Sequence, residues 1–207
     1  SNGYMKSPAQ MTHIFRHIPD AIHNSLAIAE QCNIMLPLGT VNFPPFISPE
    51  EETHSSHLKK LVLSGITKLY PASIPNKVKR RLDYELKIIN DLNFATYFLI
   101  VWDIVREAKK RDIATIGRGS AANSLVCHAL NITDVDPIRH NLYFERVLNP
   151  ERTDYPDIDI DFPSNRRDEI LGYVFKKYGQ DHVALISSHV HFRGRSALRE
   201  VGKALGI

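Results

Sequence analysis

One short stretch of the chain, residues 156–162, constrains the fold more than any other. It reads Pro-Asp-Ile-Asp-Ile-Asp-Phe, so carboxylates alternate with large apolar side chains. Successive side chains of a β-strand point to opposite faces, which predicts Asp157, Asp159 and Asp161 on one face and the apolar residues on the other. Aspartate is a poor strand former, and carboxylates this close together repel one another unless cations lie near them.

Two interpretations of this acidic strand are open from the strand alone. A pair of Mg²⁺ ions would remove the repulsion and could hold the phosphates of a nucleotide. Alternatively, the strand is a solvated sheet edge whose charges prevent aggregation.

A second feature is the glycine turn Gly-Arg-Gly-Ser at residues 117–120. An apolar run precedes it and a run of small and apolar residues follows it, which predicts a strand, a tight turn and a helix capped by Ser120. Free backbone N–H groups at such a turn can bind phosphate, and glycine lets the phosphate come close. The turn lacks the patterns of a P-loop and of a dinucleotide fold. Its small residues could instead serve close helix packing.

Together, the glycine turn and the acidic strand resemble the palm of the polymerase-beta-like nucleotidyltransferases. The longer sequence resembles one bacterial family, the alpha subunit of DNA polymerase III, a C-family DNA polymerase. The resemblance runs from about Tyr4 to Ile207 and is carried by residues 97–101, 117–120, 132–137, 144–152 and 156–162. Residues 115–116 and 121–124 look more like the error-prone branch of this family than the main replicase.

The resemblance implies an α+β fold, a palm with a mixed sheet and flanking helices, together with a helix-rich N-terminal part and the start of a thumb. We expect the N-terminal part, with its proline-rich connection, at residues 1–70, the palm core at residues 71–188 and the start of the thumb at residues 189–207.

The resemblance also implies roles for individual residues. Asp157 and Asp159 correspond to the family's catalytic, metal-binding aspartates, and Gly119 and Ser120 to its triphosphate contacts, with Arg118 beside them. The family's third catalytic carboxylate lies on a later strand, so we expect an excised fragment that is inactive alone.

One further basic residue precedes the acidic strand. Arg146 could neutralise charge on a leaving pyrophosphate and so belong to the nucleotide-binding residues. It could equally pair with the neighbouring Glu145.

The expected function is template-dependent nucleotidyl transfer from a dNTP to a primer 3′-hydroxyl, with two Mg²⁺ ions as cofactors. The implied partners are primer-template DNA, dNTP, a sliding clamp and other replisome or repair subunits bound through other regions, in the cytoplasm. One alternative is a non-catalytic nucleic-acid-binding module with a vestigial acidic strand, whose DNA affinity depends on salt but not on divalent ions. Another is a nucleotidyltransferase that acts on a small molecule or a tRNA end.

Composition adds weaker constraints. The net charge of +3 over 207 residues is only mildly basic, and 43% hydrophobic residues are enough for a core. Cys32 and Cys127 are far apart without a C-x-x-C motif, which favours buried free thiols in a reducing cytosol. No apolar run approaches 18 residues, so nothing places the chain in a membrane.

Hydrophobic periodicity and capping signals predict the remaining elements. Helices are expected to begin at the Ser7-Pro8 capping box and at Pro19, and to cover residues 75–92, 165–178 and 195–205. The first half of the segment 97–110 is expected to be buried against the palm sheet. A short buried strand is expected at residues 183–186, and an extended connection at residues 36–51.

Overall fold

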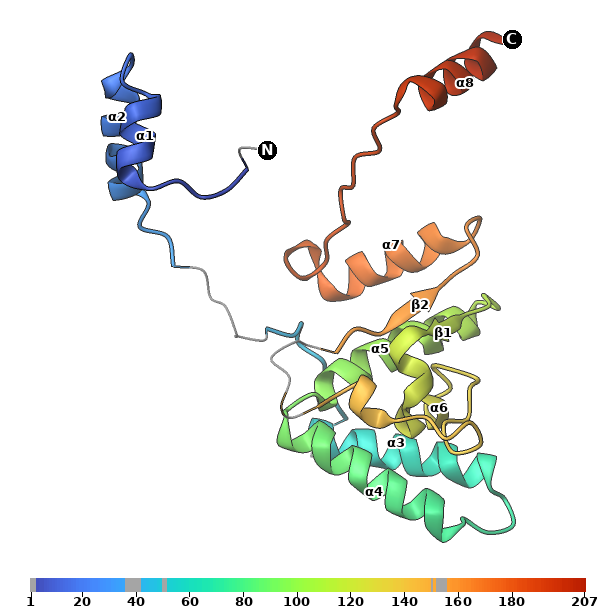
Figure 1. The fold of residues 1–207 in the computed structure, drawn as a ribbon. Helices are drawn as coiled ribbons and strands as arrows, with labels where there is room; N and C mark the ends of the chain where they lie inside the picture. Colours follow the sequence, from blue (N-terminus) through green and yellow to red (C-terminus); the bar gives the residue numbers. More distant parts are fainter. Residues whose placement is uncertain (1–2, 36–41, 50–51, 150, 152–155) are drawn as a thin grey trace. The chain divides into compact units, whose positions relative to one another are not determined.

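The chain divides into two compact units, residues 1–41 and 42–207 (Figure 1). The structure, a computed structural model, describes residues 3–35, 42–49, 52–149, 151 and 156–207. The domain boundaries predicted after residues 70 and 188 remain predictions.

The smaller unit consists of two helices, α1 (Pro8–Ile14) and α2 (Pro19–Gln31). Each begins at a proline, as predicted, because proline lacks the N–H that the first helical turn leaves unpaired. Ser7 Oγ accepts a hydrogen bond from the Gln10 N–H at 3.3 Å, and Gln10 Oε1 accepts one from the Ser7 N–H at 2.9 Å, which confirms the capping box. Of the predicted connection, the described residues 42–49 lie in no helix or strand, and the rest falls outside the described part of the chain.

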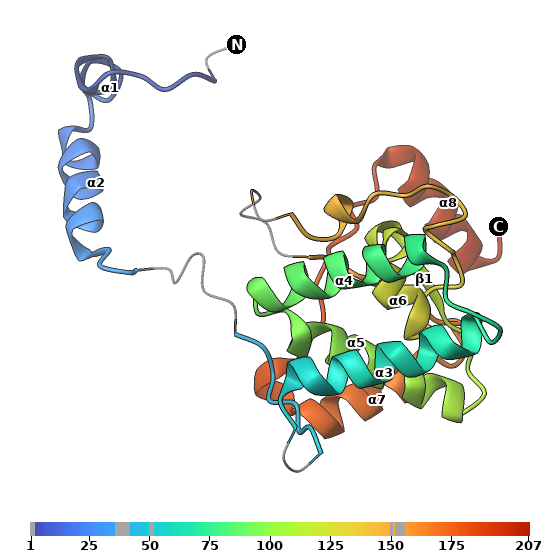
Figure 2. The ribbon, with the colours of Figure 1, turned by 90° about the horizontal axis from the view of Figure 1, so that it is seen from below.

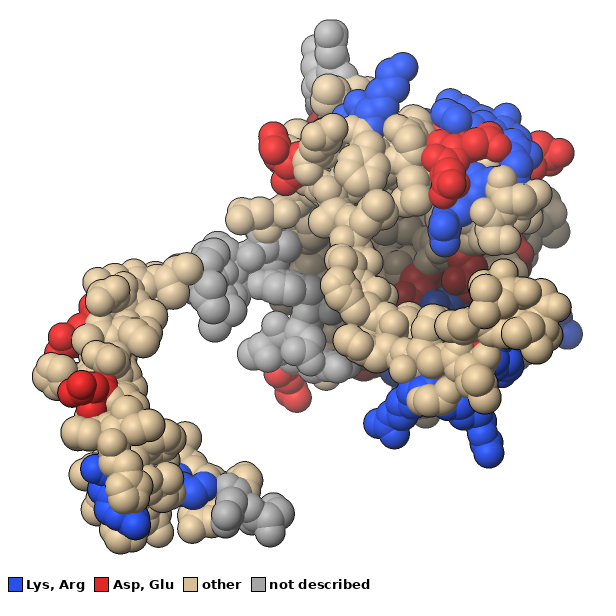
Figure 3. Space-filling view, turned by 90° about the horizontal axis from the view of Figure 1, so that it is seen from above, with Lys and Arg blue, Asp and Glu red and all other residues tan. Residues whose placement is uncertain are grey.

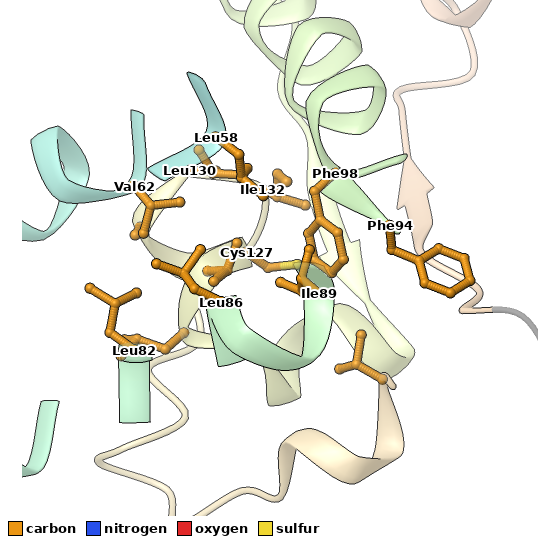
Figure 4. Packing of buried hydrophobic residues seen from close by; sticks show 14 of the residues in the cluster. Leu58, Val62, Leu82, Leu86, Ile89, Phe94, Phe98, Cys127, Leu130 and Ile132 are labelled. Carbon is orange, nitrogen blue, oxygen red and sulfur yellow. The ribbon is translucent and has the colours of Figure 1, made fainter. Parts of the chain in front are cut away.

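The larger unit is built around helices α3 (His54–Leu69), α4 (Asn76–Asp91), α5 (Ala95–Lys110) and the short α6 (Leu125–Ala129). Figure 1 shows α3 and α4 on one side of α6, with the strands on the other, and Figure 2 shows α3 and α4 from below. Cys127 of α6 lies among buried side chains from α3, α4 and α5, including Val62, Leu86 and Phe98 (Figure 4). This cluster is the main hydrophobic core.

Helical spacing explains which residues enter this core. On α4, Val78, Leu82, Leu86 and Ile89 recur every three or four positions and are buried, as predicted. No single helix within the described residues is both long and apolar enough to cross a membrane. The pair α4 and α5 reaches that length only with a bend of 111° between them.

Two strands, β1 (Ile116–Arg118) and β2 (Asp159–Asp161), pair antiparallel. They form the two-stranded sheet of the described residues, so the α+β class is confirmed. The predicted mixed sheet of a palm stays a prediction.

The helix cap predicted after the glycine turn was wrong. The chain leaves β1 through a 3₁₀-helix, η1 (Gly119–Asn123), and α6 is capped by Ser124, whose Oγ accepts from the Cys127 N–H at 3.1 Å. The Ser120 hydroxyl donates instead to a carbonyl of the acidic strand segment. Both serines precede helical residues, so the cap pattern alone did not separate them.

A second prediction, the buried strand at residues 183–186, was also wrong. These residues form no strand, and the Leu185 and Ile186 side chains are 65% and 95% exposed. They follow helices α7 (Arg167–Tyr178) and η3 (Gln180–His182) and precede helix α8 (Gly194–Leu205). No residue of α8 is buried. An apolar run becomes a buried strand only where another strand pairs with it.

The prediction of buried thiols was half right. Cys127 is fully buried, and burial raises the pKa of its thiol to about 12. Cys32 is exposed.

A buried carboxylate joins α4 to α6. Glu85 is fully buried and accepts hydrogen bonds from the Ser124 hydroxyl at 2.8 Å and from the N–H groups of Leu125 and Val126, each at 3.0 Å. Arg81 Nε donates to it at 2.6 Å. Burial raises the pKa of the Glu85 carboxyl, and the hydrogen bonds from Leu125, Arg81 and Val126 act against that shift. The start of α6, and with it the end of η1, is therefore held against α4.

A second buried carboxylate joins α5 to α7. Asp103 accepts hydrogen bonds from the Tyr173 hydroxyl at 2.7 Å and the Tyr178 hydroxyl at 2.9 Å, and it pairs with Lys177 at 2.6 Å and Arg106 at 2.8 Å. Burial alone would raise the pKa of Asp103, but the hydrogen bonds from Lys177 and the two tyrosines lower it. Because α7 follows β2 in the chain, this network anchors the C-terminal side of the acidic strand.

The Glu85 network yields a stability prediction. We expect Glu85→Ala to lower the free energy of unfolding by about 3–5 kcal/mol, because it removes the partner of Arg81 Nε, of a buried hydroxyl and of two buried N–H groups. Asp83→Ala, which removes an exposed carboxylate from the same helix, should change it by less than about 0.5 kcal/mol. Urea denaturation of both variants measures the difference. Equal effects would show that the four hydrogen bonds do not stabilise the fold.

Candidate active site

The acidic strand has the two faces that its sequence predicts. Ile158 and Ile160 are half-buried and pack against the main core. Phe162 packs against a smaller cluster of Ala108, Ile113 and Ile170. On the other face, the carboxylates of Asp157 and Asp161 are exposed and Asp159 is half-buried.

Strand pairing brings the glycine turn to the acidic strand. In the antiparallel register, Arg118 lies opposite Asp159, and Ile116 lies opposite Asp161. The Arg118 guanidinium donates to Asp159 Oδ2 at 3.2 Å and to Asp161 Oδ2 at 2.8 Å. One arginine therefore neutralises two carboxylates of the strand. Sequence reasoning placed Arg118 near a triphosphate and missed this contact.

The two positions of the turn that hold glycine require it for different structural reasons. A Cβ on Gly117 would lie 2.2 Å from the carbonyl oxygen of Ile132, so a larger residue cannot fit there. Gly119 has a φ of +63°, in the left-handed region that favours glycine. A Cβ on Gly119 would lie 3.2 Å from Asp159 Oδ2. Close packing therefore explains Gly117, whereas Gly119 brings the turn within contact distance of a predicted metal ligand.

Asp157 lies just before β2, outside the strand ladder. Its carbonyl oxygen accepts a hydrogen bond from the Ser120 hydroxyl. The next N–H, that of Ile158, donates to the hydroxyl oxygen of Tyr97 on α5 at 2.9 Å. Burial, together with the nearby Asp157 charge, raises the pKa of Tyr97 to about 12, so its hydroxyl stays neutral. The sequence offered no signal for this role of Tyr97, because the contact spans 61 residues.

Arg146 lies on a 3₁₀-helix, η2 (Phe144–Arg146), that packs beside η1. Its side chain is exposed and makes no hydrogen bond or ion pair with the described residues, including the predicted metal ligands. The alternative pairing with Glu145 is absent there too. Glu145 Oε1 instead accepts a hydrogen bond from the Tyr84 hydroxyl at 2.6 Å. Within the described residues, Arg146 is therefore a cation without a side-chain partner, on an element that packs beside η1.

The side-chain oxygens of the candidate site can be compared with the ligands that a metal ion requires. Carboxylate oxygens suit Mg²⁺, which usually keeps several waters and uses one or two carboxylates together with substrate phosphates. Asp157 and Asp159 provide such oxygens in accessible positions. Within the described residues, no three His, Cys, Asp or Glu side chains are grouped to hold a metal by themselves. The site fits an ion shared with phosphate, and it does not form a complete protein cage.

The face of the molecule drawn in Figure 3 carries charges of both signs. In the space-filling view, Lys and Arg side chains lie at several separate places, with Asp and Glu side chains between them (Figure 3). One hollow of the larger unit holds acidic and basic side chains together. The charge on this face is therefore mixed, in keeping with the small net charge of +3.

Comparisons with known proteins identify the family of the chain. The family model for the bacterial DNA polymerase III alpha NTPase domain matches residues 56–207. An error-prone DNA polymerase of Symbiobacterium thermophilum is 47% identical over 204 residues, which cover 99% of this chain and 19% of that protein. The DNA polymerase III subunit alpha of Bacillus subtilis is 45% identical over 98% of this chain and 18% of its own length.

These relatives bear on the branch of the family and on the extent of the chain. The error-prone polymerase and the subunit alpha are similarly identical to this chain, at 47% and 45%. These identities therefore do not assign the chain to either branch of the family. The chain spans about a fifth of the length of the relatives that it matches. From the family match over most of its length, the chain belongs to the bacterial DNA polymerase III alpha family.

Proposed function

We propose that this chain forms the palm region of a DNA-directed DNA polymerase, which transfers a nucleotide from a dNTP to a primer 3′-hydroxyl under template direction. The observation that carries the proposal is the β1–β2 register, which sets Arg118 and Gly119 against Asp159. A phosphate-binding type of turn and an acidic strand thereby meet at one place. Residues 71–188 would form the palm, with a helical part before them and the start of a thumb at residues 189–207.

Two Mg²⁺ ions are the proposed cofactors, held by Asp157 and Asp159. Bound there, they would supply Lewis-acid stabilisation of the charge that develops on the reacting phosphate. The protein's own part is positional: the strand ladder sets Asp159, and Gly119 leaves room beside it. The third carboxylate expected from the family resemblance would come from another part of the protein, so the 207-residue chain alone should not extend a primer.

Arg118 would take two roles in turn. Without divalent ions, its guanidinium neutralises Asp159 and Asp161. A guanidinium also binds phosphate through two parallel hydrogen bonds. Once the carboxylates have other counter-ions, Arg118 can turn to the triphosphate, where Ser120 and Arg146 are the other proposed contacts.

The proposed partners follow from this reaction. They are primer-template DNA and dNTP, with a sliding clamp and other replisome or repair subunits bound by other parts of the protein. The proposed place of action is the bacterial cytoplasm, where the chromosome lies. Relatives named DNA polymerase III subunit alpha and error-prone DNA polymerase support these assignments.

Primer extension by the full-length polymerase proposed to contain this chain tests the function. We expect Asp159→Asn to lower turnover by more than about 100-fold, because outer-shell metal partners alone are worth 10–100-fold. Its melting temperature should stay near that of the wild type, because the lost ion pair is partly exposed.

Asp161→Asn is the matched control. It removes the same charge from the same strand and also loses an Arg118 contact, but it should retain turnover within a few fold. If Asp159→Asn extended primers normally, the catalytic centre would lie elsewhere, and the binding-module alternative would replace the proposal.

Thermal melts of the 207-residue chain test the counter-ion role of Arg118. In EDTA, Arg118→Gln should lower the melting temperature slightly, because exposed ion pairs contribute at most about 1 kcal/mol. Added Mg²⁺ or Mn²⁺ should then raise the melting temperature of Arg118→Gln more than that of the wild type, because no guanidinium competes for the carboxylates.

The control for this experiment is Lys110→Gln, which removes one positive charge from an exposed position on α5. An equal metal-induced shift in all three proteins would contradict a counter-ion role for Arg118.

A further inference from the structure

One peptide unit beside the candidate site is held by side chains at both of its polar groups. It is the peptide that links Asp157 to Ile158, just before β2 begins. Its C=O accepts a hydrogen bond from the Ser120 hydroxyl, and its N–H donates to the Tyr97 hydroxyl oxygen at 2.9 Å. The peptide is thus satisfied without a strand partner, by two residues that lie 37 and 61 positions away in the sequence.

The Tyr97 hydroxyl is well placed to hold this peptide because its ring is itself fixed. The ring centroid lies 5.7 Å from that of Phe43, 6.3 Å from that of Phe94 and 5.9 Å from that of Phe98. Phe94 and Phe98 are buried. A ring packed on several sides has little freedom to move its hydroxyl group.

The two predicted metal ligands are positioned by different means. Asp159 sits in the ladder opposite Arg118, so strand pairing and an ion pair both locate it. Asp157 lies outside the ladder, and its carboxylate makes no hydrogen bond or ion pair within the described part of the chain. An aspartate carboxylate is joined to the backbone by a single methylene group. The position of the Asp157 carboxylate therefore depends on how firmly its backbone is held.

We propose that Tyr97 and Ser120 are positioning residues that clamp the Asp157–Ile158 peptide and keep Asp157 in place beside Asp159. This inference rests on the proposed function and deepens it. Mg²⁺ requires near-ideal octahedral geometry, so a small displacement of one ligand weakens binding. The clamp also gives Ser120 a role that does not require a nucleotide.

Mn²⁺ binding to the full-length polymerase, measured by electron paramagnetic resonance without DNA or nucleotide, tests this clamp. Tyr97→Phe keeps the ring and removes only the hydroxyl group. We expect it to weaken Mn²⁺ binding roughly 10-fold, the range seen for outer-shell metal partners, and to raise the Mg²⁺ concentration for half-maximal primer extension by a similar factor. Turnover at saturating Mg²⁺ should stay within a few fold of the wild type.

Two further variants separate the possible explanations. Ser120→Ala should also weaken Mn²⁺ binding in the absence of nucleotide; a change confined to the KM for dNTP would show a triphosphate contact and would overturn its part in the clamp. Tyr84→Phe is the control for loss of a tyrosine hydroxyl, because Tyr84 binds Glu145 and not the acidic strand. It should leave both metal measurements unchanged.

The outcomes distinguish this inference from the function on which it rests. If Tyr97→Phe matched Tyr84→Phe in both metal measurements, the hydroxyl would not position Asp157, and the inference would be wrong even if Tyr97→Phe melted at a lower temperature. If Asp159→Asn also left Mn²⁺ binding and extension unchanged, the proposed function itself would fail.

Discussion

The antiparallel pairing of β1 with β2 joins the two segments on which the candidate site depends, and Arg118 lies 41 positions before its partner Asp159 in the sequence. Aspartates on alternate positions of one strand repel one another, and aspartate favours turns over strands. The pairing offsets both costs, because it places a guanidinium within 3.2 Å of two carboxylates. The same contact sets the glycine turn beside the carboxylates, so the strand's stability and the proposed chemistry have one physical origin.

Two buried carboxylates hold the elements around this strand pair. Glu85 fixes the start of α6 against α4, and Asp103 fixes α7 against α5. A buried charge is tolerated only when donors surround it, and each donor must point at the carboxylate. Such a network therefore specifies the orientation of the helices that it joins. Since η1 precedes α6 and β2 precedes α7, both segments of the site end in an element that is fixed in this way.

The success of sequence reasoning varied with the range of the interactions. Helical periodicity located α4 and its buried residues, and proline located the starts of α1 and α2, because these signals act within a few residues. The cap at Ser120 and the strand at residues 183–186 were wrong, because each pattern fitted its short segment and the outcome depended on a distant partner. The exposure of Cys32 likewise depends on what surrounds α2 and not on the residue type.

The candidate site shows the same division between local signals and contacts made by distant segments. The alternation of residues 157–162 suffices to predict one acidic and one apolar face, because the direction of a side chain in a strand is a local property. The turn composition likewise pointed to Gly119, Ser120 and Arg118 as one group. That Arg118 pairs with Asp159 and Asp161, and that Tyr97 and Ser120 hold the peptide after Asp157, could not be predicted locally. These contacts arise where the folded chain brings distant segments together, and their geometry depends on the packing of the helices between them.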